Sequence, residues 1–354
     1  MSEINKLEDV ILENRNSLKT DRLDMSYGEI LNLYENDELI ISPQFQRLFR
    51  WSIYQRTRFL ESILLGIPTP PIFVAEDSDG NWELVDGLQR ISTIISFFGK
   101  LRDRDKDNNW VMEQGGLIKE LEGFSLSTLP ETYVKNIKRT YCRVEIIKWD
   151  SEYDLRYELF NRLNTGGTPL KEQEIRNCIF RGTSEKFNDL LLELSKNTDF
   201  ASLISLSEQK KSELYDQELV LRFLALYNSD LDKIETKNIS EFMTNYMQEE
   251  VKNRDFDYEA NKDIFNRVMK VLVNTNIKFK FKNNQFSTSL YDAITVAVAK
   301  NIEKYEIMGA QDIEAKVEEL KKDDIFNKYV GSASSSKTRV LKRMKRAMEL
   351  FGDV

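Results

Sequence analysis

The sequence predicts an α+β fold for the N-terminal part of the chain and an all-helical C-terminal part. Two short apolar runs around a turn-forming loop, at residues 72–75 and 82–85, indicate a hairpin, and residues 141–149 indicate a further strand. From about residue 184 onward the apolar residues recur at helical spacing instead. The 354 residues are enough for two domains, and we place these at residues 1–182 and 183–354.

The chain before the hairpin is predicted to be mainly helical. Residues 1–40 are expected to form one or two helices, the second from Tyr27 to Glu35, and a short apolar run, Leu39–Ile41, follows them. Pro43 and the alternation after it indicate an extended segment. The apolar spacing of residues 52–65 predicts an amphipathic helix with a serine in the N-cap position.

The second strand of the hairpin runs into the segment DGLQR, residues 86–90, and then into the helix ISTIISFFG. Residues 101–130 are a polar excursion that we expect to be an insertion with short strands. After the third strand, helices are expected at about residues 152–163 and 171–180, with the loop Asn164–Pro169 between them.

Histidine is absent from the sequence, which has 51 Lys+Arg and 59 Asp+Glu for a formal net charge of −8. Without an imidazole the chain cannot form a Ser-His-Asp or Cys-His nucleophile system, nor the centre of an HNH nuclease. Phosphoryl chemistry stays open, because carboxylates, Arg, Lys and Mg²⁺ carry it out through positioning and charge neutralisation. The acidic total argues against a surface covered with DNA-binding charge, although it allows a local basic face.

One local basic segment lies near the C-terminal end of the sequence. Its basic residues alternate with apolar residues at helical spacing and are Lys337, Arg339, Lys342, Arg343, Lys345 and Arg346. This pattern fits an amphipathic helix with a solvated basic face, which we favour, or a helix that contacts phosphates.

Three segments place polar residues beside strand ends or glycine loops. They contain Gln46, Arg47 and Trp51; Asp86, Gly87, Gln89 and Arg90; and Asn164, Thr165 and Gly166, with Glu174, Arg176 and Asn177 shortly after. Arginines can clamp phosphate oxygens, glycines let backbone N–H groups approach an anion, and Asp86 could hold Mg²⁺ or position a water. Trp51 is a candidate for stacking on a nucleobase. The alternatives are structural: ion-paired arginines, glycines that end helices, and aromatic rings in the core.

The segments PQFQRLFRW, ESILLGIPTPPIFV, LVDGLQRISTIISFF and FNRLNTGGTPLKEQEIRNCIF occur in this order. Together they resemble the N-terminal domain of GmrSD-type restriction endonucleases, a family of the ParB/sulfiredoxin superfamily that is widespread in bacterial phage defence. The resemblance covers about residues 25–180. It implies a ParB/sulfiredoxin-like N-terminal domain with a small mixed sheet, followed by a helical extension.

In that family a DGQQR-like motif is tied to nucleotide binding and hydrolysis and to DNA recognition. The resemblance therefore implies a nucleoside triphosphate (GTP or ATP) and Mg²⁺ as cofactors, and DNA as a partner. It implies catalytic roles for Asp86, Gln89 and Arg90, with Asp86 also as the metal ligand, while Leu88 stands where the common motif has Gln. Nucleotide-binding roles are implied for Gln46, Arg47, Gly87, Asn164, Thr165 and Gly166.

Full-length members of the family pair this domain with a His-based HNH nuclease, which this sequence cannot form. We therefore predict an NTP-dependent phage-defence protein in a form without that nuclease. Two alternatives stay open: a non-catalytic DNA-sensing or regulatory module that acts with a separate nuclease, and a ParB-like nuclease that uses carboxylates and metal. A homo-oligomer is also open.

The N-terminal sequence has no apolar signal core, and no segment approaches the roughly 20 apolar residues of a membrane span. The two cysteines, Cys142 and Cys178, lie in apolar or helical contexts without metal-binding spacing. We therefore expect a cytoplasmic protein with two buried thiols.

Overall fold

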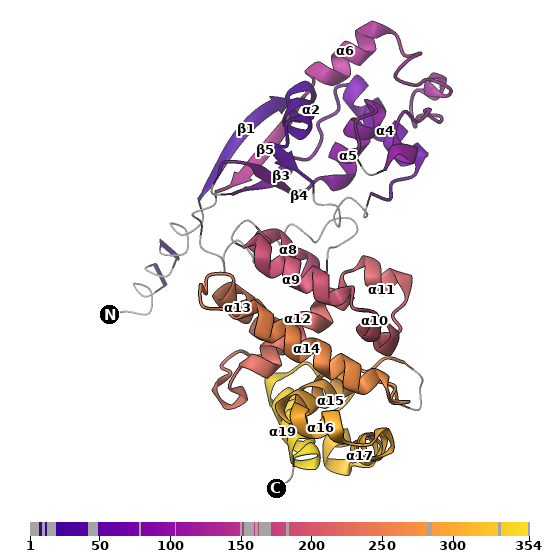
Figure 1. The fold of residues 1–354 in the computed structure, drawn as a ribbon. Helices are drawn as coiled ribbons and strands as arrows, with labels where there is room; N and C mark the ends of the chain where they lie inside the picture. Colours follow the sequence, from indigo (N-terminus) through magenta and orange to yellow (C-terminus); the bar gives the residue numbers. More distant parts are fainter. Residues whose placement is uncertain are drawn as a thin grey trace. The chain divides into compact units, whose positions relative to one another are not determined.

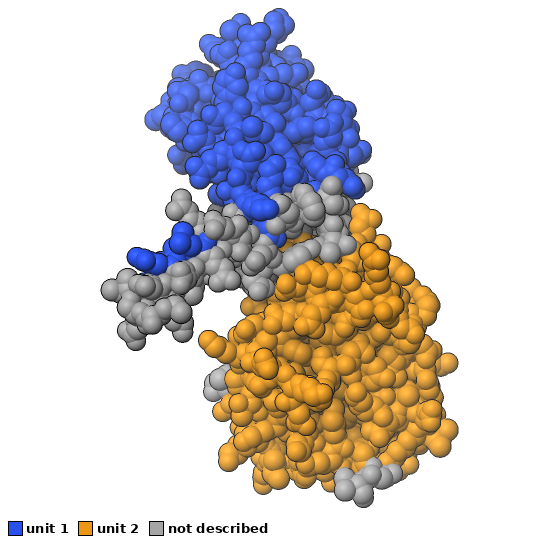
Figure 2. Space-filling model, turned by 90° about the vertical axis from the view of Figure 1, so that its left-hand side faces the viewer, with its two compact units in different colours: residues 1–170 blue, residues 171–354 orange. Residues whose placement is uncertain are grey.

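The computed structural model of the chain describes a set of residues that form two compact units, residues 1–170 and residues 171–354, which Figure 2 distinguishes by colour. The described residues are 7–8, 11–12, 19–41, 49–77, 79–102, 104–148, 151, 159, 162, 171–181, 184–281, 285–331 and 334–352. The division between the units lies one helix earlier than the domain boundary expected at residue 182.

The first unit contains a five-stranded mixed sheet in the order β1-β5-β3-β4-β2 (Figure 1). Its strands are β1 (Thr20–Ser26), β2 (Leu39–Ile40), β3 (Ile72–Glu76), β4 (Trp82–Asp86) and β5 (Tyr141–Ile147). The hairpin of β3 and β4 is antiparallel, as is the pair of β1 and β5, whereas β3 runs parallel to β5 and β2 parallel to β4. The predicted hairpin and the predicted third strand are thereby confirmed.

Helices and sheet enclose the core of this unit. The helices are α2 (Tyr27–Glu35), α4 (Ile53–Leu64), α5 (Leu88–Phe97) and α6 (Glu131–Arg139). Val74 of β3, Leu84 of β4 and Ile91 of α5 are completely buried in one apolar cluster. The N-cap predicted for the helix at residues 52–65 is confirmed: Ser52 is the N-cap of α4 and forms a capping box with Gln55.

Two expectations for this unit are wrong. Residues 20–26, expected within a helical region, form β1 because they pair along the whole of β5, from Thr20 opposite Ile147 to Ser26 opposite Tyr141. The described part of residues 101–130 contains no strand; it has two 3₁₀ turns, Asp105–Asp107 and Lys119–Leu121. The helix expected at residues 152–163 lies almost entirely outside the described residues.

The second unit consists of helices apart from short turns and bridges in its described part. They are α8 (Glu172–Arg181), α9 (Glu185–Ser195), α10 (Thr198–Ile204), α11 (Glu208–Ser212), α12 (Tyr215–Asn228), α13 (Ile239–Glu250), α14 (Tyr258–Val273), α15 (Thr288–Lys300), α16 (Ile302–Ile307), α17 (Ala310–Lys322), α18 (Asp324–Lys328) and α19 (Lys337–Phe351). The central helices are α12 and α15, which are buried on nearly every side. The all-helical prediction for this part is confirmed, and none of the described helices combines the length and the apolar character needed to span a bilayer.

Candidate functional site

The site begins with an irregularity at the end of the β3–β4 hairpin. Phe73 is opposite Asp86, but the next residue, Val74, is opposite Leu84, so the register shifts by one residue and Val85 is the extra residue of β4. A bulge of this kind bends a strand and redirects the side chains next to it. Asp86, the last residue of β4, therefore lies at a local distortion of the sheet.

Gly87 connects this strand end to helix α5. Its φ of 99° lies in the left-handed region, and it is the N-cap of the helix. A Cβ atom at this position would lie 2.6 Å from Cγ2 of Ile72, inside the core. Glycine is needed here both for the backbone conformation and for the close packing.

Helix α5 starts without a side-chain cap because Gly87 has no side chain to supply one. The first N–H groups of a helix have no acceptor within the helix, and the helix dipole makes this end partly positive. The start of α5 is thus suited to an anion, and it lies directly after the Asp86 carboxylate.

Asp86 and Arg90 form an ion pair across the first turn of α5, with 2.9 Å between Oδ2 and Nη2. Arg90 also donates from Nη1 to the carbonyl oxygens of Pro70 and Pro71, the latter at 3.0 Å. Its side chain is 14% exposed, whereas that of Asp86 is 39% exposed. The Arg90 guanidinium is therefore largely occupied by its hydrogen bonds to the segment that leads into β3, whereas the Asp86 carboxylate is accessible to solvent.

Gln89 faces a different segment. Its Oε1 accepts hydrogen bonds from the backbone N–H groups of Arg50, at 3.0 Å, and Trp51, at 3.1 Å. The DGLQR segment thereby fixes the backbone that directly follows the first polar segment of the sequence. Gln89 acts here as a positioning residue.

Two arginines also donate hydrogen bonds to this part of the backbone. Arg56 donates from Nε to the Trp51 carbonyl at 3.0 Å and lies 4.1 Å from the centroid of the Phe49 ring. Arg104 donates to the Phe49 carbonyl at 3.1 Å, and both arginines pair with Asp107. Sequence reasoning missed both arginines, because their shared partner Asp107 lies in a segment that looked like a solvated loop.

Trp51 is partly buried and packs edge-on against Phe59, with 5.7 Å between ring centroids. Phe49 is almost completely buried. Of the two aromatic residues, only Trp51 keeps part of its surface accessible for a ligand.

Two neutral groups lie beneath the turn. Burial raises the pKa of the Tyr27 phenol and of the Cys142 thiol above their ordinary values, although the nearby Arg90 guanidinium opposes both shifts. Both groups are therefore uncharged at pH 7. Cys142 is a buried free cysteine, as expected, and the side chain of Cys178 lies outside the described residues.

The structure brings together five of the predicted site residues, namely Trp51, Asp86, Gly87, Gln89 and Arg90. The other five, Gln46, Arg47, Asn164, Thr165 and Gly166, lie outside the described residues. Within the described part of the chain, no cluster of three or more Asp, Glu, Cys or His side chains could hold a metal. A metal at this site would depend on Asp86 and on ligand oxygens.

A comparison with known protein families gives a match to most of this unit and to the helix that follows it. The family described as "GmrSD restriction endonuclease, N-terminal domain" matches residues 27–181. Residues 27–181 are therefore similar to a GmrSD N-terminal domain. No match was found among curated proteins or among solved structures.

Helix α8, the last helix of the segment that matches the GmrSD family, packs in the second compact unit. Arg176 is completely buried and donates to Thr244 Oγ1 at 3.0 Å and to Ser240 Oγ at 2.7 Å. Asn177 donates to Gln217 Oε1 at 2.8 Å. These two candidate polar residues therefore hold α8 against α12 and α13.

The basic face expected on α19 is smaller than the sequence indicated. Arg343 is 2% exposed and donates to the Tyr329 and Ser334 carbonyls, each at 2.8 Å, and its burial lowers its pKa to about 10. Arg346 pairs with Asp323 at 2.8 Å. The expectation that Arg343 lies on a solvated face is wrong, because it shares the buried face of α19 with Val340 and Ala347. Lys342 and Lys345 are exposed.

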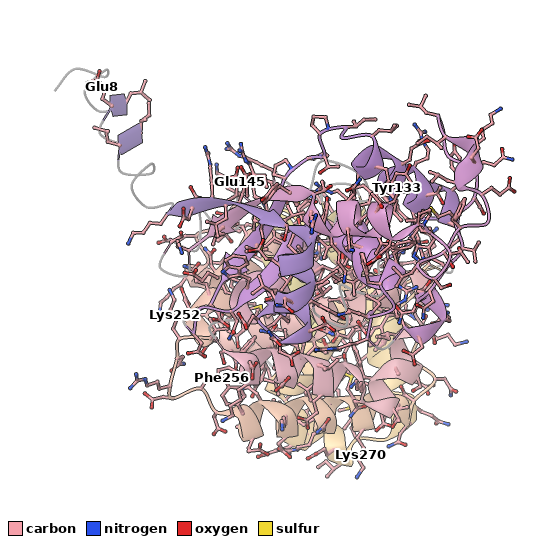
Figure 3. All side chains as sticks on the ribbon, turned by 90° about the horizontal axis from the view of Figure 1, so that it is seen from above. Glu8, Tyr133, Glu145, Lys252, Phe256 and Lys270 are labelled. Atoms are coloured by element: carbon pink, nitrogen blue, oxygen red, sulfur yellow. The ribbon has the colours of Figure 1, made fainter. Side chains whose placement is uncertain are left out.

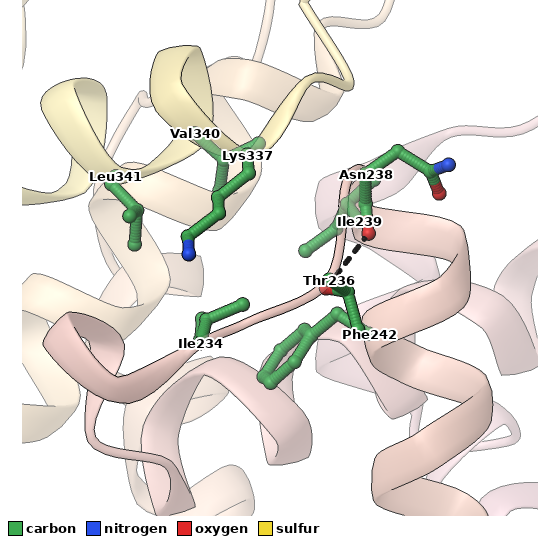
Figure 4. Close-up of a pocket in the computed structure, with 8 residues that line it drawn as sticks. All are labelled: Ile234, Thr236, Asn238, Ile239, Phe242, Lys337, Val340 and Leu341. Atoms are coloured by element: carbon green, nitrogen blue, oxygen red, sulfur yellow. Dashed lines mark hydrogen bonds between the residues drawn. The ribbon is translucent and has the colours of Figure 1, made fainter. Parts of the chain in front are cut away.

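A shallow hollow beside the start of α19 is a weaker candidate (Figure 4). It is lined by Ile234, Thr236, Asn238, Ile239, Phe242, Lys337, Val340 and Leu341. The Thr236 hydroxyl is engaged with the Asn238 carbonyl at 3.3 Å. With Lys337 as its one charged lining residue, the hollow lacks the groups that the strand-to-helix turn offers to a charged ligand.

Proposed function

We propose that the GmrSD N-terminal domain of this chain binds a nucleoside triphosphate, GTP or ATP, with Mg²⁺ at the turn between β4 and α5, and hydrolyses it in restriction or phage defence. The observation that carries the proposal is the combination of an accessible carboxylate, Asp86, with a helix start that has no side-chain cap. These are the two elements that a metal-bound phosphate requires.

Phosphate oxygens fit the helix start for two reasons. Backbone N–H groups in the first turn of α5 can donate to an anion, and the helix dipole favours negative charge there. Gly87, the N-cap residue, has no side chain that could accept hydrogen bonds from these N–H groups. Glycine-led helix starts of this kind let a phosphate approach the backbone closely.

Mg²⁺ fits the donor set as well. This ion is commonly held by one or two carboxylates together with phosphate oxygens and waters rather than by a full protein cage. Asp86 supplies the one carboxylate, and its side chain is 39% exposed. When bound, the ion would neutralise phosphate charge, and Asp86 would hold it or orient a water.

The remaining residues have supporting roles in this proposal. Arg90 holds Asp86 in place through their ion pair, and Gln89 fixes the backbone at Trp51. Trp51 offers a partly exposed ring to a nucleobase. Gln46, Arg47, Asn164, Thr165 and Gly166 stay candidates for phosphate and nucleotide contacts through their place in the family motifs.

DNA is the proposed partner, because the family is one of restriction endonucleases. Lys342 and Lys345 on α19 are the basic side chains we propose for phosphate contacts. We also propose that the sheet of this domain is of the ParB/sulfiredoxin type. Nucleotide binding without turnover would favour the alternative role of a sensing module.

Isothermal titration calorimetry tests the proposal directly. We expect the purified chain to bind GTP or ATP in the presence of Mg²⁺, and Asp86→Asn to weaken binding at least tenfold, about 1.4 kcal/mol, because a metal ligand is lost. Phosphate release measured on the same samples then separates hydrolysis from binding.

The matched control is Asp79→Asn, which makes the same chemical change at the exposed loop on the other end of the hairpin. It should bind like the wild type. Thermal unfolding confirms that both variants are folded. A wild-type chain that binds no triphosphate, or an Asp86→Asn variant that binds normally, sinks the proposal.

A further inference from the structure

Strand β1 is an open edge of the sheet in the first unit (Figure 1). No strand of the described residues pairs with its outer side, and five of its seven residues are exposed. Leu23, at its centre, is 43% exposed. Open edges with apolar residues are the usual sites at which a further strand adds to a sheet.

The hydrogen bonds at the two ends of β1 show which backbone groups face outward. Lys148 donates to the Lys19 carbonyl at 3.0 Å, and Tyr27 donates to the Thr140 carbonyl at 3.1 Å. In an antiparallel ladder the residues alternate, so the odd-numbered residues of β1 bond to β5. The backbone N–H and C=O groups of Arg22 and Asp24 therefore point away from the sheet, and the Arg22 N–H donates to Oδ1 of the neighbouring Asp21 at 2.7 Å.

The sequence of β1 is complementary to itself in one antiparallel register. If two copies of β1 meet with Leu23 on the two-fold axis, Arg22 of each copy lies opposite Asp24 of the other. This register uses the outward-facing backbone groups of Arg22 and Asp24, and the second strand replaces the exposed Asp21 carboxylate as the acceptor for the Arg22 N–H. Centring the pair on Arg22 or on Asp24 would instead place like charges opposite each other, which is unfavourable.

The neighbouring strand extends this complementarity. Arg22 pairs with Glu145 at 2.9 Å and Asp24 with Arg143 at 3.0 Å, all on the same face of the sheet (Glu145 is labelled in Figure 3). Across two joined copies, each row would read Glu145, Arg22, Asp24, Arg143. The charges in that row alternate in sign over four strands.

We propose that β1 pairs with β1 of a second copy of this chain, in an antiparallel register centred on Leu23, so that two sheets join into one. The two exposed Leu23 side chains then cover each other at the axis. Edge pairing buries little surface compared with a standard interface, so the dimer is expected to be weak and reversible.

Cysteine cross-linking tests the register. At the axis, Leu23 and its copy form a non-hydrogen-bonded pair with about 4.5 Å between Cα atoms, which a disulfide can span. We expect Leu23→Cys to give a covalent dimer when treated with oxidised glutathione. The control, Asp21→Cys, lies on the same face of β1 but opposite Met25, roughly 13 Å along the strand from its own copy, and should stay uncross-linked.

Charge complementation tests the chemistry through sedimentation equilibrium of the full chain. Arg22→Asp and Asp24→Arg should each weaken self-association at least tenfold, because each places like charges opposite one another. An equimolar mixture of the two should associate again as a heterodimer, since every Asp then faces an Arg.

Circular dichroism establishes that the variants are folded. A wild-type chain that stays monomeric into the high micromolar range overturns the proposal. So does equal cross-linking of Leu23→Cys and Asp21→Cys, or a mixture that associates no better than its separate components.

Discussion

Gly87 is the residue whose replacement we expect to disturb the site most directly. Gly87→Ala must place a Cβ 2.6 Å from Cγ2 of Ile72 while the backbone keeps a φ of 99°. The cost of the left-handed backbone conformation and the cost of the steric overlap with Ile72 are additive. We therefore expect the free energy of unfolding to fall by at least about 2 kcal/mol. Urea denaturation followed by circular dichroism measures this loss.

Gly80→Ala separates the two causes. Gly80 has a similar φ of 86°, but no atom lies within 4 Å of the added Cβ. It should cost only the backbone strain, about 1 kcal/mol. Equal losses at Gly80 and Gly87 would show that the close packing against Ile72 is not important.

At the residue scale, the sequence indicated the right turn but not the role of each side chain. Asp86, Gly87 and Arg90 could be identified because a polar group, a glycine and a helix start occur together there. That Arg90 donates to two proline carbonyls could not be predicted, since it depends on where the chain passes before β3. The packing of Arg56 on Phe49 depends in the same way on tertiary structure.

Glu61 of α4 holds an irregular segment of the first unit and gives a pH-dependent prediction. Its buried carboxylate accepts hydrogen bonds from the backbone N–H groups of Gly116, Leu117 and Ile118 at 2.6–3.0 Å. Burial disfavours the charge, but these three donors outweigh it and hold the pKa of Glu61 below its ordinary value of 4.5. We expect Glu61→Gln to lower stability by about 1–3 kcal/mol at pH 7.

The sign of the pH effect follows from the lowered pKa. The carboxylate contributes its full stability above the ordinary value near 4.5, and the contribution is lost as the pH falls through the folded-state pKa. The stability difference between wild type and Glu61→Gln should therefore shrink below about pH 4.5 in denaturation series. Glu131→Gln, at an exposed i,i+4 pair with Lys135, should show a difference of under about 1 kcal/mol throughout.

Helices α12 and α15 are joined by a buried ion pair. Arg222 and Asp292 form two hydrogen bonds, with 2.9 Å between Nε and Oδ1, and their side chains are 7% and 1% exposed. Arg222→Met leaves the Asp292 carboxylate buried without its partner, so we expect a loss of about 3–5 kcal/mol.

A double-mutant cycle measures this coupling. Arg222→Met combined with Asp292→Leu removes both charges and should cost less than the sum of the single variants. Arg267→Met, at an exposed pair with Glu306, should cost under about 1 kcal/mol. Strictly additive losses at Arg222 and Asp292 would argue against a coupled pair.

At the element scale, local signals identified the helices and the hairpin, and failed where pairing is long-range. Strand β1 has no apolar run, and five of its residues are exposed, so nothing in its own sequence marks it as a strand. Its conformation comes from β5, more than a hundred residues away along the chain. Propensity is a weak guide in such a case, because tertiary pairing overrides it.

At the scale of the whole molecule, the segment that matches the family and the compact units have different boundaries. The family match extends through Arg181, whereas the second compact unit begins at Lys171. A helix over residues 171–180 could be predicted, and Gln173, Arg176 and Asn177 share one of its faces. That this polar face is buried against α12 and α13 depends on partners such as Gln217 and Thr244, which the local sequence does not reveal.

A crystal structure of the full chain with a non-hydrolysable GTP or ATP analogue and Mg²⁺ tests the nucleotide proposal most directly. We predict that the phosphates lie at the first turn of α5 and that the metal lies about 2.1 Å from a carboxylate oxygen of Asp86. Phosphates bound elsewhere in the chain, with no metal at Asp86, would contradict the proposal.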